Sequence, residues 1–227
     1  MIKIFYLILF FLFTQSAIKS QEYWIKQASP TSKDLKVCFF TDSLNGWIGG
    51  DSGLIIHTTD KGQTWNYQNS GVNHWIVSMF FLNERIGYAL TWETDITPPN
   101  FYGTRIMQTS NGGNNWSNYL LPDTNLFLHT IYFIDSLNGY LGGTSGYIFY
   151  TSNSGSDWIR ATTDSGSFQG FPINKFQFYD SQNGYAVGGQ IDIAGLIWKT
   201  TNGGRNWKNQ VVGPEPVFDL HIIDSLN

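Results

Sequence analysis

Three acidic residues lie near aromatic residues in the longer loops and could do acid–base chemistry: Glu93, Asp95 and Asp192. Glycoside hydrolysis needs two carboxyl groups roughly 5–10 Å apart across the scissile bond. Glu93 and Asp95 belong to the segment "WETDITPPNFYG", which also carries Trp92 and Tyr102. Acids in long loops are usually only solvated. Hydrolysis is therefore an alternative that turnover of aryl-glycosides or xyloglucan, and its loss in Glu93→Gln, would reveal.

Aromatic and histidine side chains in loops of the same kind point instead to binding. Aromatic rings form the buried centres of many protein interfaces. Packing between neighbouring structural units is the alternative for each of them. The candidate partner-binding residues are His74, Trp75, Trp92, Glu93, Asp95, Phe127, His129 and Phe171.

An octet that occurs four times also carries oxygen-bearing side chains, which are ligands for hard metal ions. The copies are "TTDKGQTW" (58–65), "TSNGGNNW" (109–116), "TSNSGSDW" (151–158) and "TTNGGRNW" (200–207). One carboxylate or amide per turn supplies too few oxygens for calcium, so we expect no metal site. A catalytic constellation is needed once, whereas a unit of architecture is needed once per unit. The octet is therefore interpreted as scaffold.

A second signature alternates with the octets and completes a four-stranded unit. Its copies are "FFTDSLNGWIGG" (39–50), "FFLNERIGYALT" (80–91), "YFIDSLNGYLGG" (132–143) and "QFYDSQNGYAVGG" (177–189), and "HIIDSLN" (221–227) begins a fifth. Apolar residues two positions apart indicate a strand, and Asn-Gly indicates a hairpin because it tolerates positive φ. The inward residues of the first strands are expected to be Cys38 and Phe40, Met79 and Phe81, Ile131 and Phe133, Phe176 and Phe178, Leu220 and Ile222.

The octet is then the turn between the third and fourth strands of each unit. We expect its Asp or Asn to bond the backbone two residues on, and its Gly to adopt a conformation that other residues reach at a cost. Its Trp is expected to bury a large ring. The residues with these structural roles are Asp60, Gly62, Trp65, Asn111, Gly113, Trp116, Asn153, Gly155, Trp158, Asn202, Gly204 and Trp207.

Four-stranded units that recur at this spacing predict a β-propeller, so the expected fold class is all-β with antiparallel blades. Four complete blades are expected at approximately 35–70, 76–121, 128–162 and 173–212, with a fifth beginning at 217–227. Residues 23–29 resemble a fourth strand and are expected to close a ring. We therefore interpret 21–227 as an incomplete propeller and the chain as the N-terminal part of a longer protein.

The octet resembles the Asp-box, also called the bacterial neuraminidase repeat, with Asn for Asp in three of the four copies. With its hairpin signature, the unit is similar to the propeller family of photosystem II assembly and stability factors, and more distantly to sialidases and sortilin-type receptors. The resemblance covers 24–227 and implies a parent ring of six or seven blades. It also implies a protein that binds assembly intermediates and does not catalyse, although the basic patch of that family has no counterpart here.

The composition and the first residues of the chain limit which partners and which cellular location are expected. A net charge of −4, with only 13 Lys and Arg, argues against a nucleic-acid partner. Lys3, the apolar run 4–13 and the polar stretch that follows are typical of a signal peptide over 1–20, with no further membrane span. We therefore expect an exported protein that is periplasmic, on the outer cell surface or secreted. The single cysteine, Cys38, allows no internal disulfide and is expected to be a small buried residue.

These features predict an exported, non-catalytic scaffold that binds a protein or peptide on the rim where the loops vary, with no cofactor. A glycan is an alternative partner. Two other functions stay open at this point: an Asp-box glycoside hydrolase of the sialidase or xyloglucanase kind, and a structural or adhesive domain of the cell surface.

Overall fold

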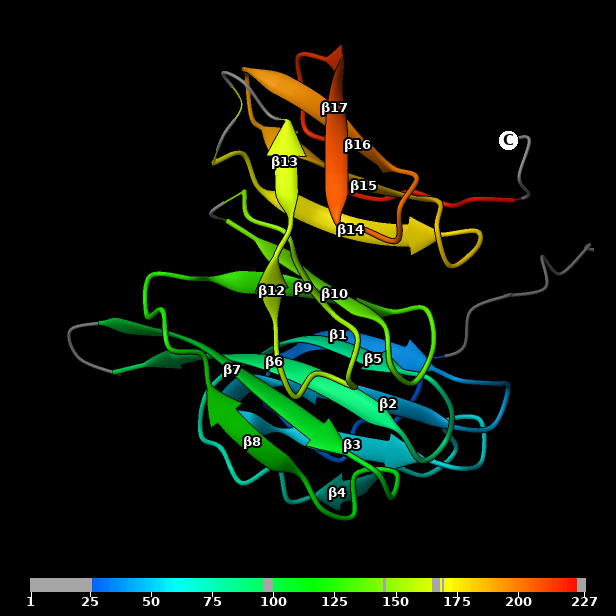
Figure 1. Ribbon diagram of the computed structural model, residues 1–227. Helices are drawn as coiled ribbons and strands as arrows, with labels where there is room; N and C mark the ends of the chain where they lie inside the picture. The colour runs from blue at the N-terminus through cyan, green and yellow to red at the C-terminus, as the bar shows by residue number, and fades with distance from the viewer. Residues whose placement is uncertain (1–25, 96–99, 145, 165–167, 169, 224–227) are drawn as a thin grey trace, which may run out of the picture.

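The computed structural model describes residues 26–95, 100–144, 146–164, 168 and 170–223. These residues form four sheets of antiparallel strands with almost no helix (Figure 1). Within each sheet, strands that follow one another in sequence are mostly hydrogen-bonded neighbours. This is the arrangement of propeller blades, and the predicted all-β fold class is confirmed.

The strands are grouped here by blade. Blade one has β1 (Leu35–Phe40), β2 (Gly46–Gly50), the 3-10 turn η1 (Asp51–Gly53), β3 (Ile55–Thr58) and β4 (Asn66–Gln68). Blade two has β5 (Ile76–Phe81), β6 (Gly87–Thr94), β7 (Phe101–Thr109) and β8 (Ser117–Leu120). Blade three has β9 (Leu128–Phe133), β10 (Gly139–Gly143), β11 (Phe149–Thr151) and β12 (Ile159–Arg160). Blade four has β14 (Ile173–Phe178), β15 (Gly184–Gln190), β16 (Ala194–Thr200) and β17 (Asn206–Gly213), with β13 (Thr162–Asp164) added at its edge.

The chain departs from the expected layout after β12, which is only two residues long. The next strand, β13, leaves blade three and pairs in parallel with β17, so blade four has five strands. The expected closing strand (23–29) lies outside the described residues up to 25, and 26–29 are not in a strand. In the expected fifth blade, 217–223 are also outside any strand, and 224–227 are not described.

The Asn-Gly hairpins do not use positive φ, which corrects the sequence-based prediction. Neither the Asn nor the Gly of these turns has a positive φ. The turn is held by a side chain instead: Asp42 accepts hydrogen bonds from the N–H groups of Leu44 and Asn45 at 2.6 and 2.8 Å. Asn83 plays this part in blade two, where the Asp is missing.

The glycine of each hairpin is required by a close approach of rings. A Cβ built on Gly139 would lie 2.5 Å from the ring of Phe133, and Gly46, Gly87 and Gly184 meet a Phe of their own blade in the same way. The strand-one Phe therefore lies across the start of strand two, a place that only a residue without a side chain leaves free.

The octet turns are built around a threonine that sequence reasoning did not single out. In blade two the buried Thr109 accepts hydrogen bonds from the N–H of Gly113 at 2.8 Å and of Asn111 at 3.3 Å, and its O–H donates to Asn111 Oδ1. The same set recurs at Thr58, Thr151 and Thr200.

The Asp or Asn of the octet bonds the backbone four residues on, not two as expected. Asp60 Oδ1 accepts from Thr64 N–H at 2.8 Å, and the three Asn copies do the same at 3.0 Å. The octet glycines Gly62, Gly113, Gly155 and Gly204 have φ between 76° and 87°. Of the four Trp side chains, only Trp207 is fully buried.

Each blade is fixed to the next by a set of three aromatic residues. The residue after the hairpin glycine stacks on the strand-one Phe of the next blade at 3.8–4.4 Å between centroids, and the octet Trp of that blade meets the Phe nearly edge-on. The sets are Trp47, Phe81 and Trp116; Tyr88, Phe133 and Trp158; Tyr140, Phe178 and Trp207.

A hydrogen bond accompanies each stack, since the same aromatic donates to a carbonyl of the next octet. The pairs are Trp47 to Gly112, Tyr88 to Ser154 and Tyr140 to Gly203, at 3.1, 3.4 and 3.0 Å. Burial raises the pKa of Tyr88 to about 12, so the phenol stays a neutral donor. The blade order is thus set by paired rings and polar contacts.

We expect Tyr140→Phe to lower the free energy of unfolding by about 1 kcal/mol, because the Gly203 carbonyl loses its donor while the ring stack is kept. Tyr185→Phe is the matched control: it lies at the same strand position in blade four, and its hydroxyl has no partner among the described residues. Urea denaturation of both variants measures the effect, and equal losses would contradict a bond between blades.

Blade one lacks such a set on its outer face. Phe40 meets Trp65 edge-on at 6.1 Å, but no described ring stacks on its other face, and it is 46% exposed. Cys38 lies on the same face of β1 and is exposed, so the prediction that it is buried is wrong. No sheet among the described residues covers this face.

Two half-buried histidines make the fold sensitive to acid. His57 stacks on Trp47 at 4.3 Å, its Nε2 has no partner among the described residues, and burial lowers its pKa below 6.5. Burial likewise lowers the pKa of His129. Both are neutral when folded, whereas an unfolded histidine binds a proton near pH 6.5, so their contribution to stability is complete above that pH and is lost below it.

We therefore expect the free energy of unfolding to fall between pH 7.5 and about 5, as urea denaturation at several pH values would show. His57→Gln, which places in blade one the residue found at 108 in blade two, should make this dependence shallower. An unchanged slope would show that His57 does not contribute.

The connections at the two ends of the sheets form two distinct sets of backbone hydrogen bonds, and these sets define two rims. The octet rim consists of the octets and the hairpin turns, which bond each other within a blade, as in Gly112 N–H to Arg85 O at 2.8 Å. The loop rim consists of the other connections. There the β2–β3 connection bonds the segment leading into blade two, with Gly53 N–H to His74 O at 2.8 Å. In blade three the β10–β11 connection bonds the segment leading into its own first strand, with Thr144 N–H to Phe127 O at 3.0 Å.

Candidate functional site

Three aromatic residues meet on the loop rim. Trp92 lies near the end of β6, Phe101 begins β7, and Phe127 leads into β9, so two blades contribute. Their centroids are 5.3–6.4 Å apart and each pair is nearly perpendicular. We call these residues the rim aromatic cluster. Phe101 is 49% exposed, so the cluster offers a ring to a partner.

Strands hold the rim aromatic cluster in place. The indole N–H of Trp92 donates to the carbonyl of Leu128 in blade three at 2.7 Å. Tyr102, next to Phe101, is exposed and donates to the Asp95 carboxylate, which raises the pKa of the Tyr102 hydroxyl. The cluster is therefore a fixed surface at the base of the β6–β7 hairpin, of the kind that binds with little loss of side-chain freedom.

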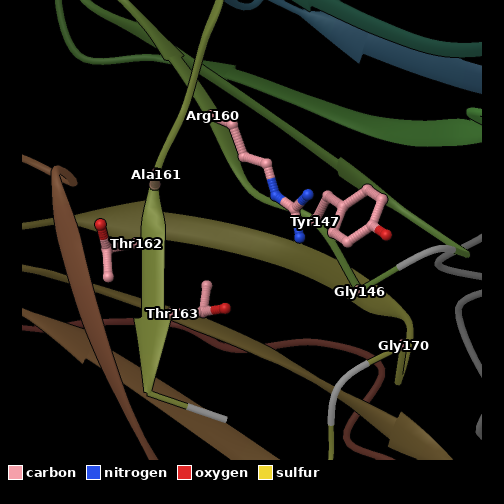
Figure 2. A pocket seen from close by; sticks show the side chains of 7 residues that line it. All are labelled: Gly146, Tyr147, Arg160, Ala161, Thr162, Thr163 and Gly170. Carbon is pink, nitrogen blue, oxygen red and sulfur yellow. The ribbon is translucent and has the colours of Figure 1, made fainter. Parts of the chain in front are cut away.

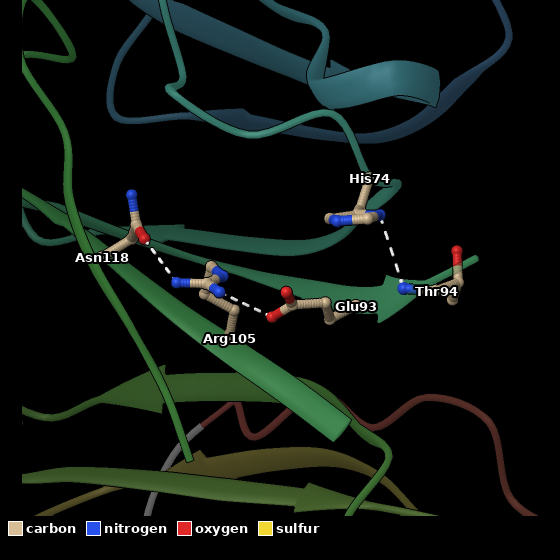
Figure 3. Close-up of polar contacts among 5 residues, drawn as sticks. All are labelled: His74, Glu93, Thr94, Arg105 and Asn118. Carbon is tan, nitrogen blue, oxygen red and sulfur yellow. Dashed lines mark hydrogen bonds and ion pairs between the residues drawn. The ribbon is translucent and has the colours of Figure 1, made fainter. Parts of the chain in front are cut away.

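The acid considered for catalysis is tied to its own sheet (Figure 3). Glu93 Oε2 pairs with Arg105 at 2.6 Å, and Arg105 also donates to Asn118 Oδ1 at 2.8 Å. Asp95 accepts from Tyr102. Each carboxylate is thus engaged by a side chain of blade two.

The remaining predicted residues are spread over other parts of the fold. His74 accepts a hydrogen bond from Thr94 N–H at 3.4 Å, also in Figure 3, and joins blade one to blade two. Trp75 is half exposed beneath the Lys36 ammonium, 5.6 Å from its ring centroid. His129 lies in β9 and lines a central cavity. Phe171 packs against Phe168 and the core of blade four.

The structure therefore brings Trp92 and Phe127 together and keeps the other candidates apart. It adds Phe101, which sequence reasoning passed over in favour of its neighbour Tyr102. Strands β6 and β7 continue further than their counterparts, and a register shift between Trp92 and Thr94 pairs Thr94 with Phe101, which brings that ring near Trp92. Strict alternation along the strands does not predict this shift.

A small pocket of about 230 Å³ lies between blades three and four (Figure 2). The Arg160 guanidinium lies over the ring of Tyr147, 3.5 Å from its centroid, and β13 supplies Thr162 and Thr163. The pocket offers the Arg160 cation and, on the same side of β13, the Thr163 hydroxyl group, which suits a small anion.

Neither a metal centre nor a membrane helix emerges from the part of the chain that the structure describes. Its His, Cys, Asp and Glu residues form no group of three or more that could hold a metal ion. None of its helices has the length and apolar character needed to cross a bilayer.

The stacked antiparallel blades define this chain as a β-propeller. Two solved structures match it at a comparable level: YCF48 bound to D1 peptide (20% identity, TM-score 0.57) and an ancestral GH74 enzyme (19% identity, TM-score 0.58). The GH74 xyloglucanase from Xanthomonas campestris matches at 12% identity and a TM-score of 0.50. These proteins therefore share the β-propeller fold with this chain.

The matches cover 79%, 81% and 77% of this chain, but only 54%, 24% and 30% of the other chains, in the same order. The chain thus spans about half the length of the YCF48 chain, and the likeness is one of fold. No protein-family model matches the sequence, and no curated protein matches it.

Proposed function

We propose that this chain is an exported, non-catalytic propeller that binds a protein or peptide partner at its loop rim. The observation that carries the proposal is the rim aromatic cluster: three rings from two blades, held by strands, with Phe101 half exposed. Such rigid aromatic groups supply most of the affinity at many interfaces. The YCF48 propeller bound to D1 peptide supports a peptide as the partner.

Export rests on the first twenty residues, whose charge and apolar run are those of a cleaved leader. It places the partner in the periplasm, on the outer surface or outside the cell. Mass spectrometry of the protein recovered from the extracytoplasmic fraction would find an N-terminus near residue 21, whereas an intact Met1 would contradict export.

The binding proposal is tested by selecting peptides from a displayed library against the whole protein. Phe101→Ser should weaken the selected peptides by about tenfold or more, since a half-exposed ring is removed without opening the core. Tyr179→Ser is the control: this tyrosine is also exposed but lies in a hairpin turn of the octet rim. Peptides that tolerate Phe101→Ser and fail on Tyr179→Ser would overturn the choice of rim.

A glycoside hydrolase is the second candidate, favoured by the GH74 enzymes that share the fold and by the acids beside Trp92. The engagement of Glu93 by Arg105 and of Asp95 by Tyr102 supports binding over hydrolysis. Aryl-glycosides and xyloglucan incubated with the protein decide the matter: turnover that Glu93→Gln abolishes would replace the binding proposal with hydrolysis.

A further inference from the structure

A central cavity of about 690 Å³ lies between the first strands of the blades. Its wall comes from β1, β5, β9 and β14 and from Leu220 and His221, all within the described chain. A cavity of this volume admits a ligand the size of a drug molecule. None of the rim aromatic cluster belongs to it.

The cavity wall changes character from blade to blade. One row of equivalent positions, each paired with the aromatic after the hairpin glycine, reads Phe39, Phe80, Tyr132 and Gln177. The next row, two residues earlier in each strand, reads Val37, Ser78, Thr130 and Lys175. Blade one is therefore apolar where blade four is polar.

The apolar side of the cavity is a run of aromatic rings in contact. The centroids of Phe39 and Phe80 are 5.2 Å apart, and those of Phe80 and Tyr132 are 5.3 Å apart. Gln177 ends this run by placing an amide where the other three blades have a ring. This side suits the apolar body of a ligand.

The polar side has hydrogen-bond donors left over. Gln177 Oε1 accepts from Ile222 N–H at 2.8 Å, whereas its amide N–H groups have no acceptor among the described residues. The Tyr132 oxygen accepts from Phe178 N–H at 3.4 Å, and its own O–H has no acceptor within the described chain. The acceptors are used and the donors are free, which favours a ligand that brings oxygen acceptors.

The charges around the cavity also favour a ligand that brings oxygen acceptors. Lys175 pairs with Asp219, and both are well exposed, so the lysine can exchange this partner for a ligand oxygen at small cost. His129 is neutral, since burial lowers its pKa, and His221 lines the same wall. The described lining residues include no carboxylate, and the nearby carboxylate of Asp219 pairs with Lys175.

We propose that the central cavity binds an elongated apolar molecule that ends in a carboxylate. Its body lies against Phe39 and Phe80, and its oxygens accept hydrogen bonds from Gln177 and Tyr132 and face Lys175. This site is separate from the loop rim and does not depend on the peptide partner.

The test titrates the whole protein with 4-phenylbutyrate and with 4-phenylbutylamine, which share the apolar body and differ in the charge at the end. Calorimetry measures affinity, and NMR shifts of the β1, β5 and β14 amides locate the site. We expect the carboxylate to bind at least about tenfold more tightly than the amine.

Two variants copy residues that other blades carry at the same positions, so the fold tolerates them. Gln177→Phe and Lys175→Thr should each weaken 4-phenylbutyrate by about tenfold, and Lys208→Thr, at an exposed position of β17 away from the cavity, should leave it unchanged. Equal affinity for both probes, no binding at millimolar concentration, or full affinity in both cavity variants would overturn the proposal.

Discussion

Gly139→Ala is expected to lower the free energy of unfolding by about 3 kcal/mol, although it adds a single methyl group. The new Cβ would lie 2.5 Å from the ring of Phe133. That ring is 1% exposed and cannot move aside, because Tyr88 stacks on it at 3.8 Å and Trp158 meets its edge at 6.0 Å. The methyl group must therefore disturb the contact between blades two and three. Urea or thermal denaturation measures the loss.

Gly46→Ala is the matched control for this substitution, because the local geometry of the hairpin is the same. Its Cβ would meet Phe40, which is half exposed and has no ring stacked on its outer face in the described chain. Phe40 can turn away, so we expect a change below about 1 kcal/mol. If Gly46→Ala proved as damaging as Gly139→Ala, the clash would lie within the hairpin and not in the packing of blades.

Thr109→Val is expected to cost about 2–3 kcal/mol with almost no change in shape. The hydroxyl of Thr109 is buried and receives the N–H groups of Asn111 and Gly113 while donating to Asn111 Oδ1. Valine leaves one buried donor, the Gly113 N–H, and one partly buried donor, the Asn111 N–H, unsatisfied, and a buried unsatisfied group costs more than a hydrogen bond contributes.

Thr201→Val provides the comparison for the octet, since that side chain is exposed and bonds no other described residue. It should unfold at the same urea concentration as the native chain. The turn would not depend on the buried hydroxyl if Thr109→Val and Thr201→Val were equally stable.

Repetition made the fold predictable from sequence. Four octets and four hairpin signatures at blade spacing define the strands, and the alternation of Met79 and Phe81 or Ile131 and Phe133 assigns their faces. Repetition does not predict which aromatic ring of a neighbouring blade each ring stacks on. The stack of Tyr140 on Phe178 joins residues of different units, so reasoning confined to one unit misses it.

The turn chemistry was predicted with the right residues but the wrong contacts. The Asp and Asn side chains were expected to accept a hydrogen bond from the backbone N–H two residues on, because they commonly do so in isolated turns. In the octet, Thr109 already takes the nearest N–H groups, so Asn111 is left to accept from Asn115. The position of one buried hydroxyl decides which of two local patterns forms.

The candidate site was predictable only in part. Trp92 and Phe127 lie together because Trp92 is near the loop-rim end of β6 and Phe127 directly precedes β9 at the same rim, which the order of elements implies. His129 was grouped with them by sequence proximity, but it lies at the register shift of β9, between Leu128 and Thr130, and lines the central cavity. Which face a residue at a strand boundary takes depends on the register, and the loop gave no signal for it.

The parallel strand β13 decides how this chain can be divided. Residues 159–160 pair within blade three, and residues 162–164 pair with β17 at the edge of blade four, beside Trp207. A single continuous segment of the chain therefore contributes a strand to each of the two sheets. A junction placed at Ala161 would separate blade four from the strand that covers its edge. In a gene assembled by duplication, the unit that could be exchanged or lost here without harm is the pair of blades, not either one alone.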